Sequence, residues 1–257
     1  MTAAKGSWLE AEGVGVTRCD AEGSPVEILR GIDMRAQPGR LTVVFGPSGG
    51  GKSTLIRLLN RLEEPTAGKI LLGGEDVIRM DPIGLRRRVG LVPQRPFMFP
   101  GTVLDNLQRP FLYRRQTPPA VDDSEILTVL DACRLSRQML TQPARTLSIG
   151  QQQRVSLART LITDPEVLLL DEPTSALDRP TGDRLGQTLK DICRKRNLTL
   201  VLVSHDLRMV EHIGDYLYYL DGGCILEEGS VGEVLSRPQT ASLRRFLAEP
   251  WERTVEE

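Results

Sequence analysis

The chain has 257 residues, of which 40% are hydrophobic, and this is enough to bury a sizeable core. Its 33 Lys and Arg against 34 Asp and Glu give a formal net charge of −1, so nonspecific attraction to nucleic acid or acidic lipid is not expected. The four cysteines are widely spaced without a C-x-x-C pair, which disfavours a zinc knuckle or a disulfide framework and favours a reducing cytoplasm.

Targeting signals are not expected in this sequence. Residues 1–13 lack a basic start followed by an apolar run, as a secretory signal would have. The longest apolar runs, such as Val167–Leu170, fall far short of the ~20 residues that a membrane helix needs. If the protein serves a membrane, we expect it to do so through a partner.

The first predicted elements are β-strands. Leu9–Arg18 alternates weakly between apolar and polar residues, and Val26–Met34 has a β-compatible composition. The turn residues Gly23-Ser24-Pro25 separate the two segments. This pattern predicts an antiparallel β layer before the main core.

A strand, a glycine-rich loop and a helix follow in that order. Leu41–Phe45 is a short apolar run that predicts a buried parallel strand, and Lys52–Leu62 has apolar residues at helical spacing. The loop between them fits G-x-x-x-x-G-K-[ST], the Walker A or P-loop motif, with Gly46, Pro47, Ser48, Gly49, Gly50, Gly51, Lys52 and Ser53. The alternative, a glycine-rich turn with a solvated lysine, is disfavoured by this strand-to-helix context.

The chemistry of this loop is that of polyphosphate binding. Glycines allow backbone N–H groups to approach the anion closely, and the N-terminus of the following helix adds partial positive charge. We expect Lys52 to reach the β- and γ-phosphates, Ser53 to place its hydroxyl on Mg²⁺, and Thr54 to supply a further phosphate contact.

Residues between Pro96 and Thr146 predict an inserted helical subdomain. Ser124–Cys133 has helical spacing, while Pro110 and Thr117–Pro119 read as breaks. The preceding loop carries Phe97 and Phe99, and two interpretations stay open: the rings form an interface with a partner, or they pack inside the subdomain.

A helix is predicted to begin at Ser148. Ser148 followed three residues later by Gln151 is a capping-box pattern, which places free N–H groups at the helix start. Such a helix start is an anion site, although an ordinary helix N-terminus has the same pattern.

Two later strands are predicted to end in polar residues. Val167–Asp171 followed by Glu172 has the form of a Walker B motif. Strand alternation would point the two side chains apart, so that Asp171 binds Mg²⁺ and Glu172 faces the γ-phosphate as general base. The alternative is an exposed Asp-Glu turn.

The other strand, Leu200–Ser204, precedes His205. Its position at the carboxyl edge of a parallel sheet favours a γ-phosphate contact over a purely structural histidine. The helical segment Arg179–Arg196 between the two strands supports an α/β core. The tail 236–257 is expected to be partly helical, with breaks at Pro238 and Pro250.

These motifs together resemble those of ABC ATPases over roughly residues 9–235. Leu147–Gln151 resembles the LSGGQ signature, Gln94 the Q-loop glutamine, Ser175–Asp178 the D-loop, and His205 the switch histidine. The resemblance implies an α/β P-loop NTPase core with a mainly parallel sheet, an N-terminal antiparallel β layer and an inserted helical subdomain. It also implies these boundaries: core 9–93 and 166–235, helical subdomain 95–165 and tail 236–257.

The resemblance further implies a function and a set of residue roles. The protein would bind ATP and Mg²⁺ and hydrolyse ATP, with Glu172, His205 and Gln94 catalytic and with the metal held by Ser53, Gln94 and Asp171; Gln94 would hold Mg²⁺ or the attacking water. Two cassettes would close head to tail, so that each signature meets the ATP of the other subunit. The trans contact would come from Ser148, Ile149, Gly150 and Gln151, and the dimer contact of the D-loop from Ser175 and Asp178.

The expected partners are a second identical cassette and an integral membrane permease, at the cytoplasmic face of the inner or cell membrane; no nucleic acid is expected. Compact cassettes of iron or metal export and of phosphate import are the nearest likeness, and neither names the cargo. Three alternatives are a soluble ABC ATPase, a regulatory module without turnover and a P-loop kinase. A soluble ABC ATPase usually carries a coiled-coil insertion or two fused cassettes, and neither is expected in this single short chain. The motifs above argue against a regulatory module and against a P-loop kinase.

Two departures from the family pattern carry predictions. Ile149 stands where the signature has its first glycine, and we predict a weaker trans contact because a β-branched residue resists positive φ and adds bulk. Val14–Asp20 has no aromatic residue for adenine, so Arg18 or Cys19 occupies that place; Arg18 could stack its guanidinium plane on the base.

Overall fold

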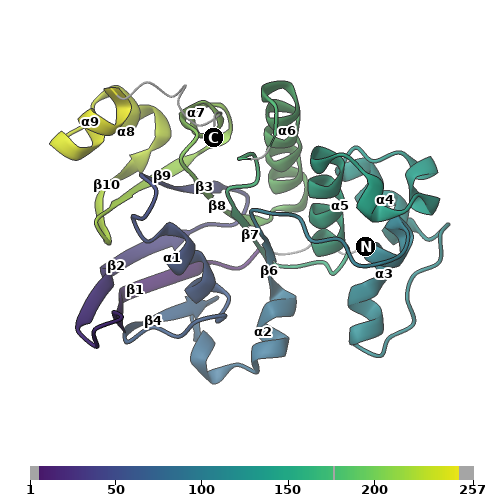
Figure 1. Cartoon of the computed structure of the whole chain (residues 1–257), viewed down its shortest axis with the longest axis horizontal. Helices are drawn as coiled ribbons and strands as arrows, with labels where there is room; N and C mark the ends of the chain where they lie inside the picture. The colour runs from purple at the N-terminus through teal and green to yellow at the C-terminus, as the bar shows by residue number, and fades with distance from the viewer. Residues whose placement is uncertain (1–5, 176, 249–257) are drawn as a thin grey trace.

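The computed structural model describes residues 6–175 and 177–248, and Figure 1 shows their arrangement. The predicted break at Pro250 lies outside the described residues. The N-terminal β layer is confirmed as an antiparallel sheet of order β2-β1-β4-β5. Its strands are β1 (Leu9–Cys19), β2 (Pro25–Ala36), β4 (Ala67–Leu72) and β5 (Glu75–Asp76).

The second sheet has the order β10-β9-β3-β8-β7-β6 and is parallel except at β10. The strands are β3 (Leu41–Phe45), β6 (Val89–Val92), β7 (Val167–Asp171), β8 (Thr199–Ser204), β9 (Tyr216–Asp221) and β10 (Cys224–Ser230). The P-loop follows β3, Glu172 follows β7 and His205 follows β8, so all three lie at the carboxyl edge of one sheet.

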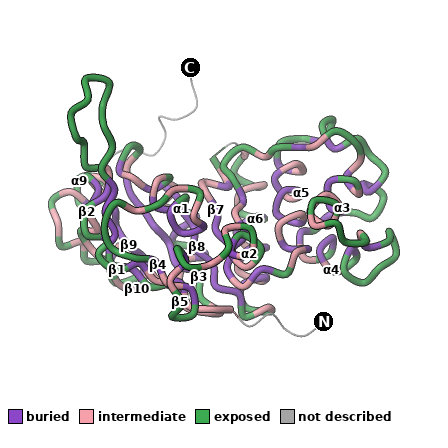
Figure 2. Tube along the Cα trace, turned by 90° about the horizontal axis from the view of Figure 1, so that it is seen from below, coloured by how far each residue is buried: buried purple, intermediate pink, exposed green. Residues whose placement is uncertain are grey.

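Side-chain alternation in this sheet builds two hydrophobic cores. Val44, Leu169 and Val203 face the antiparallel layer and α1 (Lys52–Leu59), whereas Val43 and Leu170 belong to the opposite core. Figure 2 shows the buried trace running through the middle of the molecule. The fold is therefore layered, and the strands are apolar on both faces as the sequence predicted.

Helices cover the rest of the sheet. Besides α1 they are α2 (Pro82–Arg88), α6 (Arg179–Arg196), α7 (Leu207–Ile213), α8 (Val231–Ser236) and α9 (Ala241–Ala248). The short 3₁₀ turns are Val77–Arg79, Arg137–Thr141 and Ala144–Thr146. Among the described residues no helix is long and apolar enough to cross a membrane.

The inserted helical subdomain contains α3 (Val103–Tyr113), α4 (Ser124–Ala132) and α5 (Ile149–Leu161), which lie together beside the sheet in Figures 1 and 2. The predicted break at Pro110 is wrong, because α3 continues through it to Tyr113. Proline removes one helical hydrogen bond, but Leu107 and Phe111 on either side both pack on the core and hold the helix. The boundaries 95–165 stay a prediction.

Candidate nucleotide-binding site

The P-loop is formed by a tight turn between β3 and α1. Gly46 is required here, because a Cβ would lie 2.0 Å from the carbonyl oxygen of Leu220 on β9. Gly51, the N-cap of α1, has φ 100°, a conformation that side chains with a Cβ rarely adopt. The turn therefore aims the N-terminus of α1 at the space above the loop, as phosphate binding needs.

Lys52 is buried at the base of this loop. Its Nζ donates to the carbonyl oxygens of Gly46 and Pro47 at 2.8 and 2.7 Å and lies 4.0 Å from Oε1 of Glu172. Burial lowers the pKa of Lys52, and the negative charges of Glu172 and Asp171 oppose this shift. One ammonium group thus meets both carboxylates of the site.

The two carboxylates follow each other at the end of β7, but strand alternation does not extend to Glu172. The strand ends at Asp171, and Glu172 has φ 42°, in the left-handed region that glutamate rarely adopts. Its backbone N–H donates to the carbonyl oxygen of Val203 at 2.9 Å, which fixes this turn. Backbone strain of this kind gathers at functional sites, where surrounding contacts hold it.

Two neighbours contact the Glu172 carboxylate besides Lys52. Nε2 of Gln94 donates to Oε2 of Glu172 at 3.1 Å and to Oγ of Ser175 at 3.2 Å, and Nδ1 of His205 lies 3.1 Å from Oε1. The contact with His205 lowers the pKa of Glu172, and the same contact raises the pKa of His205. The structure therefore brings together four residues that lie far apart in the sequence.

Asp171, the last residue of β7, contacts the P-loop through Ser53. Its Oδ1 accepts from Oγ of Ser53 at 3.4 Å, and burial, together with repulsion from Glu172, raises its pKa. A hydroxyl and a carboxylate are oxygen ligands of the type that Mg²⁺ takes, usually one or two per protein beside waters and phosphates. The described residues contain no cluster of three or more His, Cys, Asp or Glu side chains that could hold a metal ion.

The predicted helix start at Ser148 is confirmed. Oγ of Ser148 accepts from the N–H of Gln151 at 3.3 Å, and Oε1 of Gln151 accepts from the N–H of Ser148 at 2.9 Å. Helix geometry leaves the N–H groups of Ile149 and Gly150 without intrahelical acceptors. Gly150 has no room for a side chain, because a Cβ would lie 2.7 Å from Cγ2 of Thr181.

The backbone part of the Ile149 prediction is wrong. Ile149 is the first residue of α5 and is not among the residues with positive φ, so a β-branched side chain causes no strain there. The argument from bulk remains, since the side chain is 46% exposed at the helix start.

The signature and the P-loop do not meet within this chain. Figures 1 and 2 both show α5 in the helical subdomain, on the far side of the sheet from α1. The D-loop lies between them: Ser175 contacts Gln94, and Asp178 is the N-cap of α6 without a side-chain capping bond. Ala176 lies outside the described residues.

The predicted adenine contact is engaged elsewhere. Arg18 forms an ion pair with Glu63, which also pairs with Arg57 of α1 at 3.4 Å. Cys19 is exposed at the end of β1. The structure leaves the adenine assignment a prediction.

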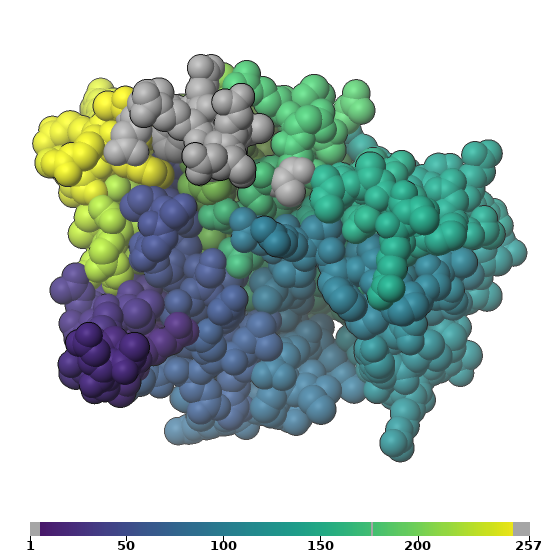
Figure 3. All heavy atoms as spheres, viewed as in Figure 1, coloured from purple at the N-terminus to yellow at the C-terminus, as the bar shows by residue number. Residues whose placement is uncertain are grey.

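Phe99 packs inside the subdomain, which is one of the two interpretations, whereas an interface role for Phe97 stays a prediction. Phe99 is half-buried, in edge contact with Phe97 and Tyr113 and beneath the guanidinium groups of Arg109 and Arg159. Phe97 is 57% exposed and Tyr113 69% exposed. Figure 3 shows a notch between the blue spheres around α2 and the teal spheres of α3, the helix that Tyr113 ends.

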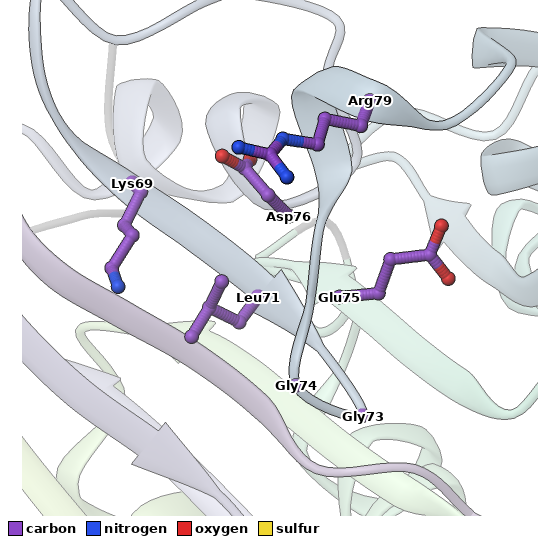
Figure 4. A pocket seen from close by; sticks show the side chains of 7 residues that line it. All are labelled: Lys69, Leu71, Gly73, Gly74, Glu75, Asp76 and Arg79. Carbon is purple, nitrogen blue, oxygen red and sulfur yellow. The ribbon is translucent and has the colours of Figure 1, made fainter.

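A separate hollow lies on the β4–β5 hairpin. In Figure 4 the side chains of Asp76 and Arg79 point toward one another, whereas Glu75 points away. The lining consists of Lys69, Leu71, Gly73, Gly74, Glu75, Asp76 and Arg79. It contains no P-loop residue and no residue of the carboxyl edge, so this hollow is not part of the candidate site.

Gln153 was not singled out from the sequence, although it lies close to the site. It is buried on α5, and its Nε2 donates to the carbonyl oxygen of Pro93, next to Gln94, at 3.3 Å. The signal was available: Gln153, Leu157 and Leu161 follow at four-residue spacing along the buried face of the helix.

Comparison with known proteins identifies the family. The profile of the ABC transporter family matches residues 29–175. Protein STAR1 of Oryza sativa subsp. japonica is 43% identical over 251 residues, which cover 95% of this chain and 69% of that protein. The methionine import ATP-binding protein MetN of Xanthomonas campestris pv. campestris is 42% identical over 232 residues, 89% of this chain and 69% of that protein.

A solved structure agrees with these sequence relatives. The dimeric post-hydrolysis state of the ATP-binding cassette MJ0796, bound to ADP and Pi, aligns with a TM-score of 0.77 and 28% identity, covering 87% of this chain and 98% of that one. The chain therefore belongs to the ABC transporter family and is an ATP-binding and ATP-hydrolysing transporter subunit.

Proposed function

We propose that the carboxyl edge of the parallel sheet is the ATPase centre and that Glu172 is its general base. The observation that carries this proposal is the position of the Glu172 carboxylate, between Lys52 of the P-loop and the side chains of Gln94 and His205. A carboxylate there can take the proton of a water that attacks the γ-phosphorus, while ADP leaves on the opposite side. The lowered pKa of Glu172 favours the ionised carboxylate, which is the form that can accept a proton.

The remaining residues are assigned around the triphosphate. The P-loop residues 46–53 and Thr54 bind its oxygens, and Lys52 exchanges its two carbonyl partners for the β- and γ-phosphates. Ser53 and Asp171 hold Mg²⁺, with Gln94 as a further ligand or as a guide for the attacking water; when bound, the ion neutralises phosphate charge. We assign Arg18 to the adenine base and His205 to the γ-phosphate.

The trans site requires a second copy of the chain. The free N–H groups at the start of α5 form an anion site that this chain's own P-loop does not reach. The related cassette MJ0796 is dimeric with ADP and Pi bound. We assign Ser148, Ile149, Gly150 and Gln151 to the partner's triphosphate, and Ser175 and Asp178 to the contact between two identical cassettes.

The transport step requires a membrane protein. The exposed side chains of Phe97 and Tyr113, which both contact Phe99, form an apolar surface that suits a short segment of an integral permease. In this proposal the cassette is a peripheral subunit at the cytoplasmic face of the inner or cell membrane. ATP-driven closure of two cassettes would then move the permease.

The assignment of the general base is tested by phosphate release from the purified chain. Glu172→Gln keeps the size of the side chain but cannot accept a proton at neutral pH, so turnover should fall at least about a hundredfold. Glu228→Gln, on the exposed side of β10, serves as the control and should leave the rate unchanged. Turnover of Glu172→Gln within a few-fold of the unmodified chain would refute the role of Glu172.

A further inference from the structure

Gln153 is a buried polar side chain with an unusual hydrogen-bond balance. It is 2% exposed, its Nε2 donates to the carbonyl oxygen of Pro93, and its Oε1 has no partner among the described residues. An unpaired buried acceptor destabilises a fold, and an apolar side chain at this position would avoid that cost. The amide therefore indicates a role for the contact with Pro93.

Two further hydrogen bonds hold the loop that follows Pro93, one from α5, the helix of the signature, and one from the segment before it. Nη1 of Arg159 donates to the carbonyl oxygen of Phe97 at 2.9 Å, and Nε of Arg145, which precedes the helix, donates to that of Met98 at 3.2 Å. Segment 93–98 is thus held by α5 and its approach at both ends. We expect the segment to move with α5 when the helix shifts.

Gln94 lies in the same segment and contacts the core. Gln94 contacts Glu172 and Ser175, which belong to the core, while its neighbour Pro93 is bonded to Gln153 on the helical subdomain. Of the three residues of the segment that are held in this way, Pro93, Phe97 and Met98, Pro93 is the nearest to Gln94 along the chain, and Gln153 is its partner. A short series of contacts therefore runs from the helix that begins at Ser148 to the catalytic carboxylate.

We propose that Gln153 is a positioning residue, which holds Pro93 so that the amide of Gln94 reaches Glu172 only when the signature helix is correctly placed. This inference rests on the proposed roles of Glu172 and of the Ser148 segment. It adds that a shift of α5 on binding of the partner's triphosphate is passed to Glu172 of the same chain through the buried amide of Gln153. Gln153 acts only through the position of Pro93 and contacts neither the nucleotide nor the attacking water.

The test replaces the amide while preserving the volume. Gln153→Met should bind ATP with a KM within about twofold of the unmodified chain, and its kcat should fall about tenfold, as expected for loss of one hydrogen bond that matters in the transition state. The double variant with Glu172→Gln and Gln153→Met should still form a dimer of two chains when MgATP is added. Gln153→Leu, a second apolar variant that cannot donate to a carbonyl oxygen, should lose activity in the same way and covers a failure of the methionine variant to fold.

Ser156→Ala is the matched control. Ser156 is buried on the same helix, and its hydroxyl is also without a partner among the described residues, but it makes no contact with segment 93–98. Its removal should leave kcat unchanged. An equal loss in Ser156→Ala and Gln153→Met would show that only the packing of α5 matters, and would overturn the proposal.

A double-mutant cycle with Gln94→Ala separates positioning from general damage. If Gln153 acts through Gln94, Gln153→Met should cause no further loss of kcat in the Gln94→Ala background. Fully additive losses would overturn the proposal, and so would an unchanged kcat of Gln153→Met. Both of these outcomes would leave the proposed ATPase function intact, provided that the unmodified chain releases phosphate. If the unmodified chain releases no phosphate, the proposed ATPase function itself is refuted.

Discussion

Ile149 shows how a single departure from a motif changes meaning once its backbone is known. The isoleucine occupies the first turn of α5 without strain, and its exposed side chain stands beside the free N–H groups of the helix start. Its expected effect is therefore steric: the side chain would keep the partner's phosphate farther from the positive N-terminus of the helix. The predicted weakness of the trans contact rests on that alone.

Ile149→Gly should consequently raise the ATPase rate of the purified chain. Closer approach of the partner's phosphate to the helix N-terminus is worth roughly 1 kcal/mol, which corresponds to an increase of about fivefold. Ile149→Val, which keeps a β-branched side chain, should leave the rate nearly unchanged. An unaltered rate in Ile149→Gly would show that the isoleucine does not limit the contact.

Several site residues could be predicted from the sequence because short motifs encode local backbone. Gly46 and Gly51 are required by a close approach and a positive φ, and Lys52 follows from the helix they begin. The left-handed conformation of Glu172 and the buried contact of Gln153 could not be predicted in this way. Both depend on segments from elsewhere in the chain, the backbone of Val203 and that of Pro93.

At the scale of elements, Glu166 ties three parts of the chain together. It precedes β7, accepts from Arg88 at the end of α2 at 2.5 and 3.0 Å, and accepts from Oγ of Ser7 ahead of β1. Burial raises the pKa of Glu166, but the bonds from Arg88 and Ser7 outweigh this and lower it overall. Arg88 and Glu166 thereby join the starts of β6 and β7, and the bond from Ser7 connects them to the start of the antiparallel layer.

This gives a pH-dependent stability prediction. A carboxyl group with a lowered folded-state pKa stabilises the fold above its unfolded-state pKa, and the contribution is lost as the pH falls through the folded-state pKa. Glu166→Gln should therefore reduce the free energy of unfolding by about 1–2 kcal/mol at pH 7, and the difference should shrink progressively below about pH 4.5.

Denaturant titrations of both chains across this pH range provide the measurement. Glu64→Gln, which removes an exposed ion pair with Arg61, is the control and should have little effect at any pH. A difference for Glu166→Gln that persists unchanged into acid would mean that its charge does not contribute.

The elements that the sequence predicted well have a strong local signal. The strands β3, β7 and β8 are continuous apolar runs, and α6 has helical spacing over 18 residues. Weak or mixed signals failed: β10 is an edge strand with two glutamates, Cys224–Ser230, that was not predicted. Pro110 was predicted to break a helix that tertiary packing continues.

At the scale of the whole molecule, the chain holds two halves of a site that do not meet. The P-loop, Glu172 and His205 share the carboxyl edge of the parallel sheet, whereas the anion site at Ser148 belongs to the helical subdomain. Two copies arranged head to tail would complete both sites at once. The related cassette MJ0796 is dimeric with ADP and Pi bound.

The measurement that tests this account most directly is the molar mass of Glu172→Gln in solution with saturating MgATP. Without hydrolysis the triphosphate remains bound, so the mass should rise to twice the 28.5 kDa of one chain, and adding Ser148→Glu should abolish the pairing by repelling the partner's phosphate. If Glu172→Gln binds ATP and keeps the mass of a single chain, also beside its membrane partner, the account of a shared site is contradicted.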